Sequence, residues 1–177
     1  MNPFLKLLVK LVKQIMKIEL NINNSIKVYD VEPRLTLLDF IRDEMKLKGT
    51  HAGCEHGVCG ACTIILNGEV VRSCMVLAVQ AVGDEIITIE GINAKEERTG
   101  ELNVLQDAFC EAHGMQCGYC TPGMVISAEV LLKKNSNPTR EEVREAISGN
   151  ICRCTGYVQI VDAIMLAAER LSGRNIK

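Results

Sequence analysis

The segment GCEHGVCGACTIILNGEVVRSC, residues 53–74, decides the fold of this chain. Its four cysteines have the spacing C-x4-C-x2-C-x11-C, and the first three match the plant-type ferredoxin arrangement that holds a 2Fe–2S cluster. The glycines among these cysteines allow the backbone to wrap closely around an inorganic core and to direct N–H groups at the sulfurs. The segment therefore predicts a first 2Fe–2S site. Its ligands would be Cys54, Cys59, Cys62 and Cys74.

The turn inside this segment explains how the fourth cysteine reaches the other three. Asn67–Gly68 separates two apolar runs, and an Asn-Gly pair favours a two-residue hairpin turn. Pairing residue 66 with residue 69 brings Cys74 back opposite Ala61 and beside Cys62. Further strands are expected at residues 17–22, 26–31 and 86–89, and a helix at residues 36–45. Residues 16–90 thus predict a small mixed sheet with one helix packed across it.

A change of period marks a second domain. Residues 91–101 are polar and bounded by glycines, which is typical of a linker. Beyond them, apolar residues recur at helical spacing in residues 102–112, 123–134, 139–149 and 158–171. Thr121 is the expected N-cap of the second helix, and Thr139 with Glu142 forms a capping box at the third. Residues 102–177 are therefore expected to form an all-α four-helix domain.

A second cysteine quartet lies in the helical domain, with the spacing C-x2-C-x31-C-x1-C. The long gap is accommodated if one helix travels about 18 Å outward and the next returns about 15 Å. Tetrahedral zinc is the main alternative for either quartet. The x4 gap and the glycines argue against zinc at the first quartet, whereas the second quartet taken alone leaves zinc open. The ligands expected here are Cys117, Cys120, Cys152 and Cys154.

The other reactive side chains are not expected to be ligands or catalytic groups. Each quartet is complete in cysteine, so His51, His56 and His113 are predicted not to bind metal. Cys110, the ninth cysteine, is predicted to be a buried structural thiol of helix 102–112. No nucleophile elbow, paired carboxylates or phosphate-binding loop is recognisable, so no catalytic residue is assigned.

Composition restricts the class of protein further. The chain has 177 residues, of which 47% are hydrophobic and 24% charged, which is typical of a globular protein. A net charge of −2 gives no footprint for nucleic acid. An odd cysteine count without a signal peptide favours the reducing cytoplasm. Residues 1–15 are interpreted as an N-terminal extension before a natural start at Met16. A basic amphipathic helix contacting a membrane or a partner is the less favoured alternative.

Three motifs together resemble the small subunit of the molybdenum hydroxylases. They are GCEHGVCGACT at residues 53–63, QCGYCTPG at 116–123 and NICRCTGY at 150–157. That family includes xanthine dehydrogenase, aldehyde oxidoreductase and aerobic carbon monoxide dehydrogenase. The resemblance extends from residue 16 to about residue 172, and only residues 1–15 depart from the usual start.

The resemblance implies a fold and a function. The fold is α+β, with a ferredoxin-like β-grasp domain followed by an all-α four-helix domain, each holding one 2Fe–2S cluster. The helical cluster would lie nearer the molybdopterin of a large subunit, and the other nearer the FAD of a medium subunit. The family also implies that Gln116 contacts the pterin and that Cys154 links pterin and cluster. A free two-cluster ferredoxin and a zinc-stabilised interaction module remain as alternatives.

Overall fold

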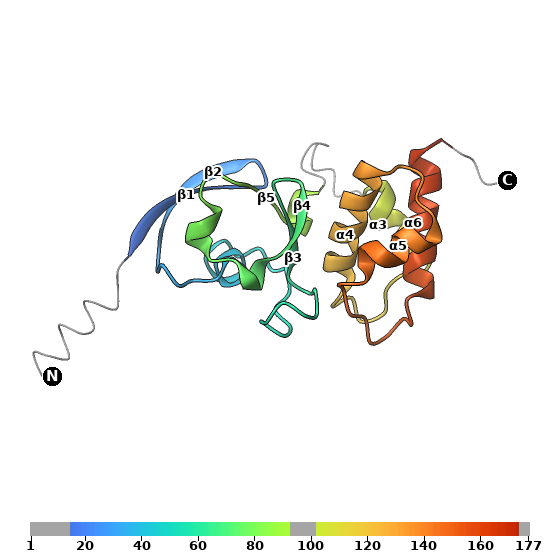
Figure 1. Ribbon diagram of the computed structural model, residues 1–177, viewed down its shortest axis with the longest axis horizontal. Helices are drawn as coiled ribbons and strands as arrows, with labels where there is room; N and C mark the ends of the chain where they lie inside the picture. Colours follow the sequence, from blue (N-terminus) through green and yellow to red (C-terminus); the bar gives the residue numbers. More distant parts are fainter. Residues whose placement is uncertain (1–14, 93–101, 174–177) are drawn as a thin grey trace, which may run out of the picture.

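The computed structural model describes residues 15–92 and 102–173. In Figure 1 these residues form a sheet part, which is blue to green, beside a helical part, which is yellow to red. The interpretation of residues 1–15 as an extension falls, apart from Ile15, outside the described residues, as does most of the expected linker. The domain boundaries given above stay a prediction.

The sheet part is built on five strands in the spatial order β2-β1-β5-β3-β4. Strands β1 and β5 are parallel, whereas the other neighbours pair antiparallel. The β3–β4 hairpin has the predicted register, with Leu66 opposite Glu69. The turn between β1 and β2 lies at Asn23 and Asn24, which take positive φ angles of 52° and 62°. The strands are β1 Met16–Ile22, β2 Ser25–Val31, β3 Thr63–Leu66, β4 Glu69–Arg72 and β5 Glu85–Ile87.

The single regular helix expected at residues 36–45 is wrong in detail. Thr36 caps a short α-helix, α2 Leu37–Asp39, and a π-helical turn follows at Phe40–Glu44. The Arg42 guanidinium donates hydrogen bonds to the carbonyls of Lys48 (3.0 Å) and Thr50 (2.6 Å). These bonds hold the chain that follows against the end of the helix. At this end the helix widens into the π-helical turn instead of continuing as an α-helix. Such π-helical turns are often found at functional sites.

Short 3-10 turns complete the sheet part. The turn Ser73–Met75 directly follows β4, and the turns Ala78–Ala81 and Ile89–Gly91 flank β5. The sheet, α2 and the π-turn enclose one apolar core of aliphatic side chains around Phe40, which is fully buried.

The helical part contains four helices, as the periodicity predicts. Capping boxes start α3 at Asn103 and α5 at Thr139, each satisfying two backbone N–H groups. The prediction that Thr121 is an N-cap is wrong, because the helix already includes Thr121 and Cys120 occupies the cap position without a side-chain bond. The helices are α3 Val104–Glu111, α4 Thr121–Lys134, α5 Arg140–Ile147 and α6 Val158–Leu171.

The two parts have separate cores that meet along α4. Figure 1 shows α4 next to β3 and β4. Ile126 and Val130 of α4 pack there against Ile65 of β3, and all three are buried. Because this contact fixes α4, it also fixes the loop that precedes it. None of the described helices is long and apolar enough to cross a membrane.

Candidate metal centres

The first cysteine quartet begins in the glycine-rich loop before β3. The backbone N–H of Cys54 donates to the sulfur of Cys59 (3.4 Å), and the N–H of Cys59 donates to the sulfur of Cys54 (3.3 Å). Gly57 and Gly60 take positive φ angles of 84° and 74°. A Cβ at Gly53 would lie 2.8 Å from the Cys59 sulfur. The loop thus folds tightly around one pair of thiols, and it does so only with glycine at these positions.

The hairpin supplies the second pair of this quartet. Both the N–H (3.2 Å) and the hydroxyl (2.8 Å) of Ser73 donate to the carbonyl of Cys62. This double contact ends the ladder and starts the 3-10 turn that carries Cys74 inward. Cys62 and Cys74 are both buried and pack together against Leu38. The first quartet is therefore arranged as two pairs, Cys54 with Cys59 and Cys62 with Cys74.

The second quartet joins the loop before α4 to the loop between α5 and α6. The sulfurs of Cys117 and Cys154 lie 3.5 Å apart. Cys152 and Cys120 interact through their side chains, forming a second pair. Tyr157, at a left-handed φ of 71°, accepts the Cys152 N–H at its hydroxyl (2.9 Å). The 31-residue gap thus closes as the helix lengths predict.

This two-by-two arrangement fits a binuclear cluster. In a 2Fe–2S cluster four thiolates are shared between two iron atoms, two on each. A structural zinc ion instead takes four ligands at one point. The paired thiols and the glycine cradle are what a 2Fe–2S group would require.

One loop thiol in each quartet ionises more easily than an ordinary cysteine. The N–H groups of His56 and Cys59 lower the pKa of Cys54 from 9.0 to about 6. The N–H of Tyr119 and then the thiol of Cys154 lower the pKa of Cys117. Backbone N–H groups that stabilise a thiolate before metal arrives also stabilise the thiolate ligand afterwards.

One thiol of each of the other two pairs behaves in the opposite way. Burial, and then the neighbouring Cys62, raise the pKa of Cys74 to about 11. Burial and the neighbouring Cys152 raise the pKa of Cys120 to about 12. Cys152 is an exception, because bonds from Thr155 outweigh the opposing effect of burial and lower its pKa. The thiols with a raised pKa need the positive charge of a metal to deprotonate at neutral pH.

A stacked pair of rings connects the two cysteine loops. The His51 and Tyr119 rings lie parallel, 4.6 Å apart with an interplanar angle of 19°. His51 Nδ1 is 2.8 Å from the Tyr119 carbonyl oxygen, and the Tyr119 hydroxyl donates to the carbonyl of Ala52. Sequence reasoning missed this contact, although Tyr119 stands between two of the predicted ligands.

Three further predicted positions have plain outcomes. Gln116, directly before Cys117, and Cys154, the last cysteine of the second quartet, are both exposed, and their expected contact with a pterin stays a prediction. The prediction of a buried Cys110 is wrong: this thiol is exposed. Helix α3 buries Ala108 and Phe109 toward the core, and its next residue, Cys110, turns to the outer face.

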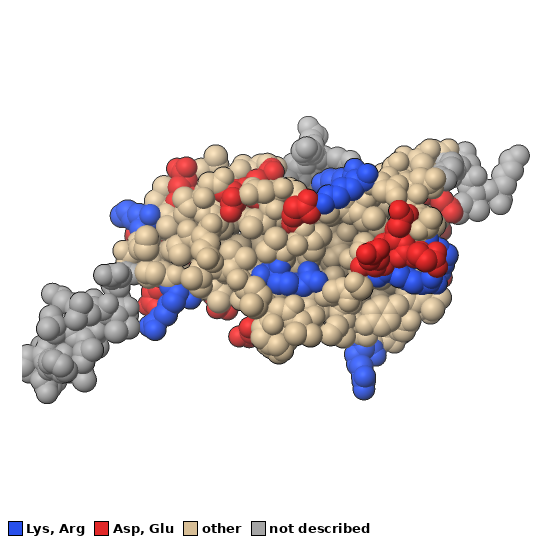
Figure 2. Space-filling model, in the orientation of Figure 1, with Lys and Arg blue, Asp and Glu red and all other residues tan. Residues whose placement is uncertain are grey.

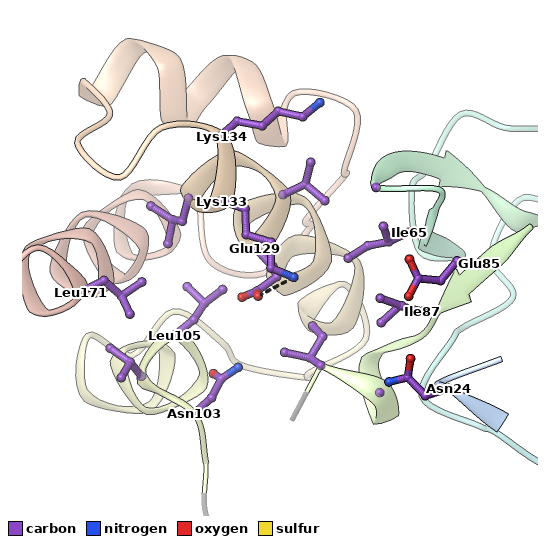
Figure 3. A pocket seen from close by; sticks show the side chains of 16 residues that line it. Asn24, Ile65, Glu85, Ile87, Asn103, Leu105, Glu129, Lys133, Lys134 and Leu171 are labelled. Carbon is purple, nitrogen blue, oxygen red and sulfur yellow. Dashed lines mark ion pairs between the residues drawn. The ribbon is translucent and has the colours of Figure 1, made fainter. Parts of the chain in front are cut away.

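A cavity of about 650 Å³ lies between the two parts, away from these sites. Figure 3 shows the residues that line it around α4, with Ile65 and Ile87 of the sheet part on one side and Leu105 of α3 on the other. Glu129 and Lys133 form an ion pair at its wall (3.1 Å). None of the eight predicted ligands lines it.

Comparison with known proteins agrees with the geometry. Residues 20–88 match a family described as 2Fe-2S iron-sulfur cluster binding domain, and residues 88–165 match a 2Fe-2S binding domain. The nicotine 6-hydroxylase small subunit of Paenarthrobacter nicotinovorans is 46% identical over 159 residues, covering 90% of this chain and 93% of that protein. The caffeine dehydrogenase subunit gamma of Pseudomonas sp. (strain CBB1) is 49% identical over 83% of this chain and 87% of its own length.

The chain belongs to the small iron–sulfur subunits of the molybdenum hydroxylases. A solved structure, quinoline 2-oxidoreductase from Pseudomonas putida 86, matches this small subunit with a TM-score of 0.83 and 47% identity. The match covers 92% of this chain and all of that one. Aldehyde oxidoreductase from Desulfovibrio gigas has a TM-score of 0.83 and 39% identity over 90% of this chain, but only 18% of that chain. The expected α+β fold is thereby confirmed, and the small subunit is an electron-transfer component of an oxidoreductase.

Proposed function

We propose that this small subunit relays electrons from a molybdopterin site on a large subunit to FAD on a medium subunit. The observation that carries the proposal is the presence of two separate quartets of paired thiols on one chain of this family. Substrate chemistry then takes place on the large subunit. In this proposal the present chain contributes ligands and geometry, and no catalytic residue.

The proposed ligands divide between the two parts. When bound, each 2Fe–2S cluster accepts and donates one electron at a time. The chain holds the sulfurs in pairs, directs N–H groups at them and buries three of the eight cysteines, and these features set the potential. The proposed ligands are Cys54, Cys59, Cys62 and Cys74 for the first cluster, and Cys117, Cys120, Cys152 and Cys154 for the second.

The order of the relay rests on the second quartet. Gln116 and Cys154 are both exposed, as a contact with a group on another subunit requires. The family resemblance assigns them to the pterin. The helical quartet would therefore receive electrons first, and the first quartet would pass them to FAD. Such a relay would take place in the cytoplasm.

A free two-cluster ferredoxin is less well supported. Ferredoxins that dock to diffusible partners would benefit from a strongly acidic surface. The face in Figure 2 instead carries acidic and basic side chains over both parts, and the net charge is −2. The relatives named above are small or gamma subunits, which supports a hetero-oligomer.

Affinity isolation tests the proposal. The tagged chain, purified from its native cells, is expected to bring down two larger polypeptides together with FAD and molybdopterin. The Cys110→Ser variant, altered at an exposed thiol outside both quartets, is the matched control and should recover the same partners. Recovery of an iron-containing chain without larger partners would contradict the subunit role and favour the ferredoxin.

A further inference from the structure

A buried polar network joins the two parts between the cysteine loops. Asn150, only 2% exposed, donates its side-chain N–H to the Gly60 carbonyl (3.0 Å) and to the Thr63 hydroxyl (3.1 Å). Arg72 donates to the same Thr63 hydroxyl (2.9 Å) and to the Gly149 carbonyl (2.6 Å). We call these five residues the interdomain joint. Two of its side chains thus cross-link the backbones of both parts.

The joint lies directly between a predicted ligand of each quartet. Beside Asn150, the Ile151 N–H donates to the carbonyl of Cys59 (2.9 Å). Cys59 belongs to the first quartet, and Ile151 directly precedes Cys152 of the second. One hydrogen bond and a few covalent bonds therefore connect the two sites. This connection depends on the register that the joint imposes on the two loops.

The interdomain joint is packed so closely that its glycines have no room for a side chain. A Cβ on Gly60 would lie 2.4 Å from the Gly149 carbonyl oxygen, and one on Gly149 would lie 2.2 Å from the Arg72 guanidinium. A Cβ on Gly123 of α4 would lie 2.5 Å from the Gly60 carbonyl oxygen. Backbones in direct contact, cross-linked by hydrogen bonds from the buried Asn150 and the half-buried Arg72, fix a distance more rigidly than an apolar contact does.

We propose that Asn150 and Arg72 are positioning residues that hold the two centres at the separation that electron transfer between them requires. The inference rests on the proposed function. One electron passes from the centre of the helical quartet, which is oxidised, to the centre of the first quartet, which is reduced; no bond forms or breaks. Because the rate of electron tunnelling falls steeply with distance, a loosened joint slows this step.

Asn150→Asp is the decisive variant. It keeps the size of the side chain but removes both N–H donors and turns a carboxylate toward the Gly60 carbonyl. The measurement is the magnetic interaction between the two centres in the dithionite-reduced full chain, observed as splitting of the EPR lines at low temperature. Dipolar interaction varies as the inverse cube of the separation. The wild type is expected to show resolved splitting, and the variant to lose it at unchanged iron content.

Ser127→Ala provides the matched control. The Ser127 hydroxyl donates to the side-chain amide oxygen of Asn150, Oδ1 (2.8 Å), but both residues belong to the helical part. The loss of this hydroxyl removes one hydrogen bond from the same network. The hydrogen bonds between the two parts stay in place. Ser127→Ala should therefore lower thermal stability and keep the splitting. A purely structural role for Asn150 would make the two variants indistinguishable in the EPR spectrum.

Arg72→Lys makes the test independent of the folding of a single variant. Lysine keeps the charge but cannot bridge Thr63 and Gly149, so the splitting should narrow in this variant too. If Asn150→Asp fails to retain its iron, Arg72→Lys decides alone. Unchanged splitting in the iron-loaded variants, or a wild type with two centres and no splitting, would overturn the inference. A wild type with fewer than two centres would instead overturn the proposed function.

Discussion

At the scale of single residues, a missing Cβ and a few backbone N–H groups shape the first site. Gly53 faces the Cys59 sulfur so closely that no side chain fits. The N–H groups of the same loop lower the pKa of Cys54. The loop is therefore set up for thiolate ligands by its backbone conformation.

Gly53→Ala is expected to abolish the first cluster. Its Cβ would lie 2.8 Å from the Cys59 sulfur and push that ligand out of its pair. Iron content should fall to about half, with one of two EPR signals lost. Gly83→Ala is the control: it stands at a positive φ of 85° with open space around it, so it costs ~1 kcal/mol of stability and leaves iron unchanged. Full iron content in Gly53→Ala would contradict the assigned cradle.

The thiols should differ in their response to pH once the clusters are removed by a chelator. A lowered pKa means that Cys54 stays a thiolate as the pH falls until about 6, whereas Cys120, with a pKa near 12, stays protonated at neutral pH. At pH 7, iodoacetamide should therefore alkylate Cys54 far faster than Cys120, with the Cys54 rate half-maximal near pH 6. Peptide mass spectrometry across pH 5–9 measures both. A Cys54 that titrates near its ordinary value of 9 would show that the loop is not pre-arranged.

The cysteine spacing predicted two groups of four thiols, and the structure brings the thiols of each group together in pairs; that they are metal ligands stays a prediction. The interdomain joint leaves no such pattern: Asn150 and Arg72 are common polar residues, and only the folded backbone brings them together. Cys110 was mispredicted for a related reason. In the sequence, a cysteine next to apolar residues can belong to either face of a short helix. In α3 the core lies on the face opposite Cys110, so this thiol is exposed.

At the scale of elements, caps and turns position the loops. Periodicity located all four helices of the helical part, and Asn67–Gly68 located the β3–β4 hairpin with its register. The π-turn at Phe40–Glu44 could not be foreseen, since it depends on bonds from Arg42 to carbonyls six and eight residues away. The local sequence pattern thus predicts the helices and strands, whereas tertiary contacts determine where they become irregular at their ends.

Thr139→Ala is expected to weaken the start of α5. It removes the hydroxyl that accepts the Glu142 N–H (3.2 Å) and donates to the Glu142 carboxylate (2.9 Å). The loss should be ~1 kcal/mol, measured as a lower melting temperature of the iron-loaded chain. Ser148→Ala, at the other end of α5 with only a local bond, should change it far less. Equal effects of the two changes would contradict the role of this capping box.

At the scale of the whole molecule, the chain forms two parts with separate cores, and each part carries one thiol quartet. No cysteine of one quartet is paired with a cysteine of the other quartet. Cys117→Ser should therefore remove one of two distinct EPR signals from the reduced chain and leave the other at full intensity. Loss of both signals, or of neither, would contradict the assignment of one cluster to each part.

The most direct test is a combined determination of iron, acid-labile sulfide and EPR spins in the anaerobically purified chain. Two paired quartets require about four iron atoms and four sulfides per chain, and two separate spin signals after reduction with dithionite. A colourless chain with stoichiometric zinc and no sulfide, or a chain with a single cluster, would contradict the assignment.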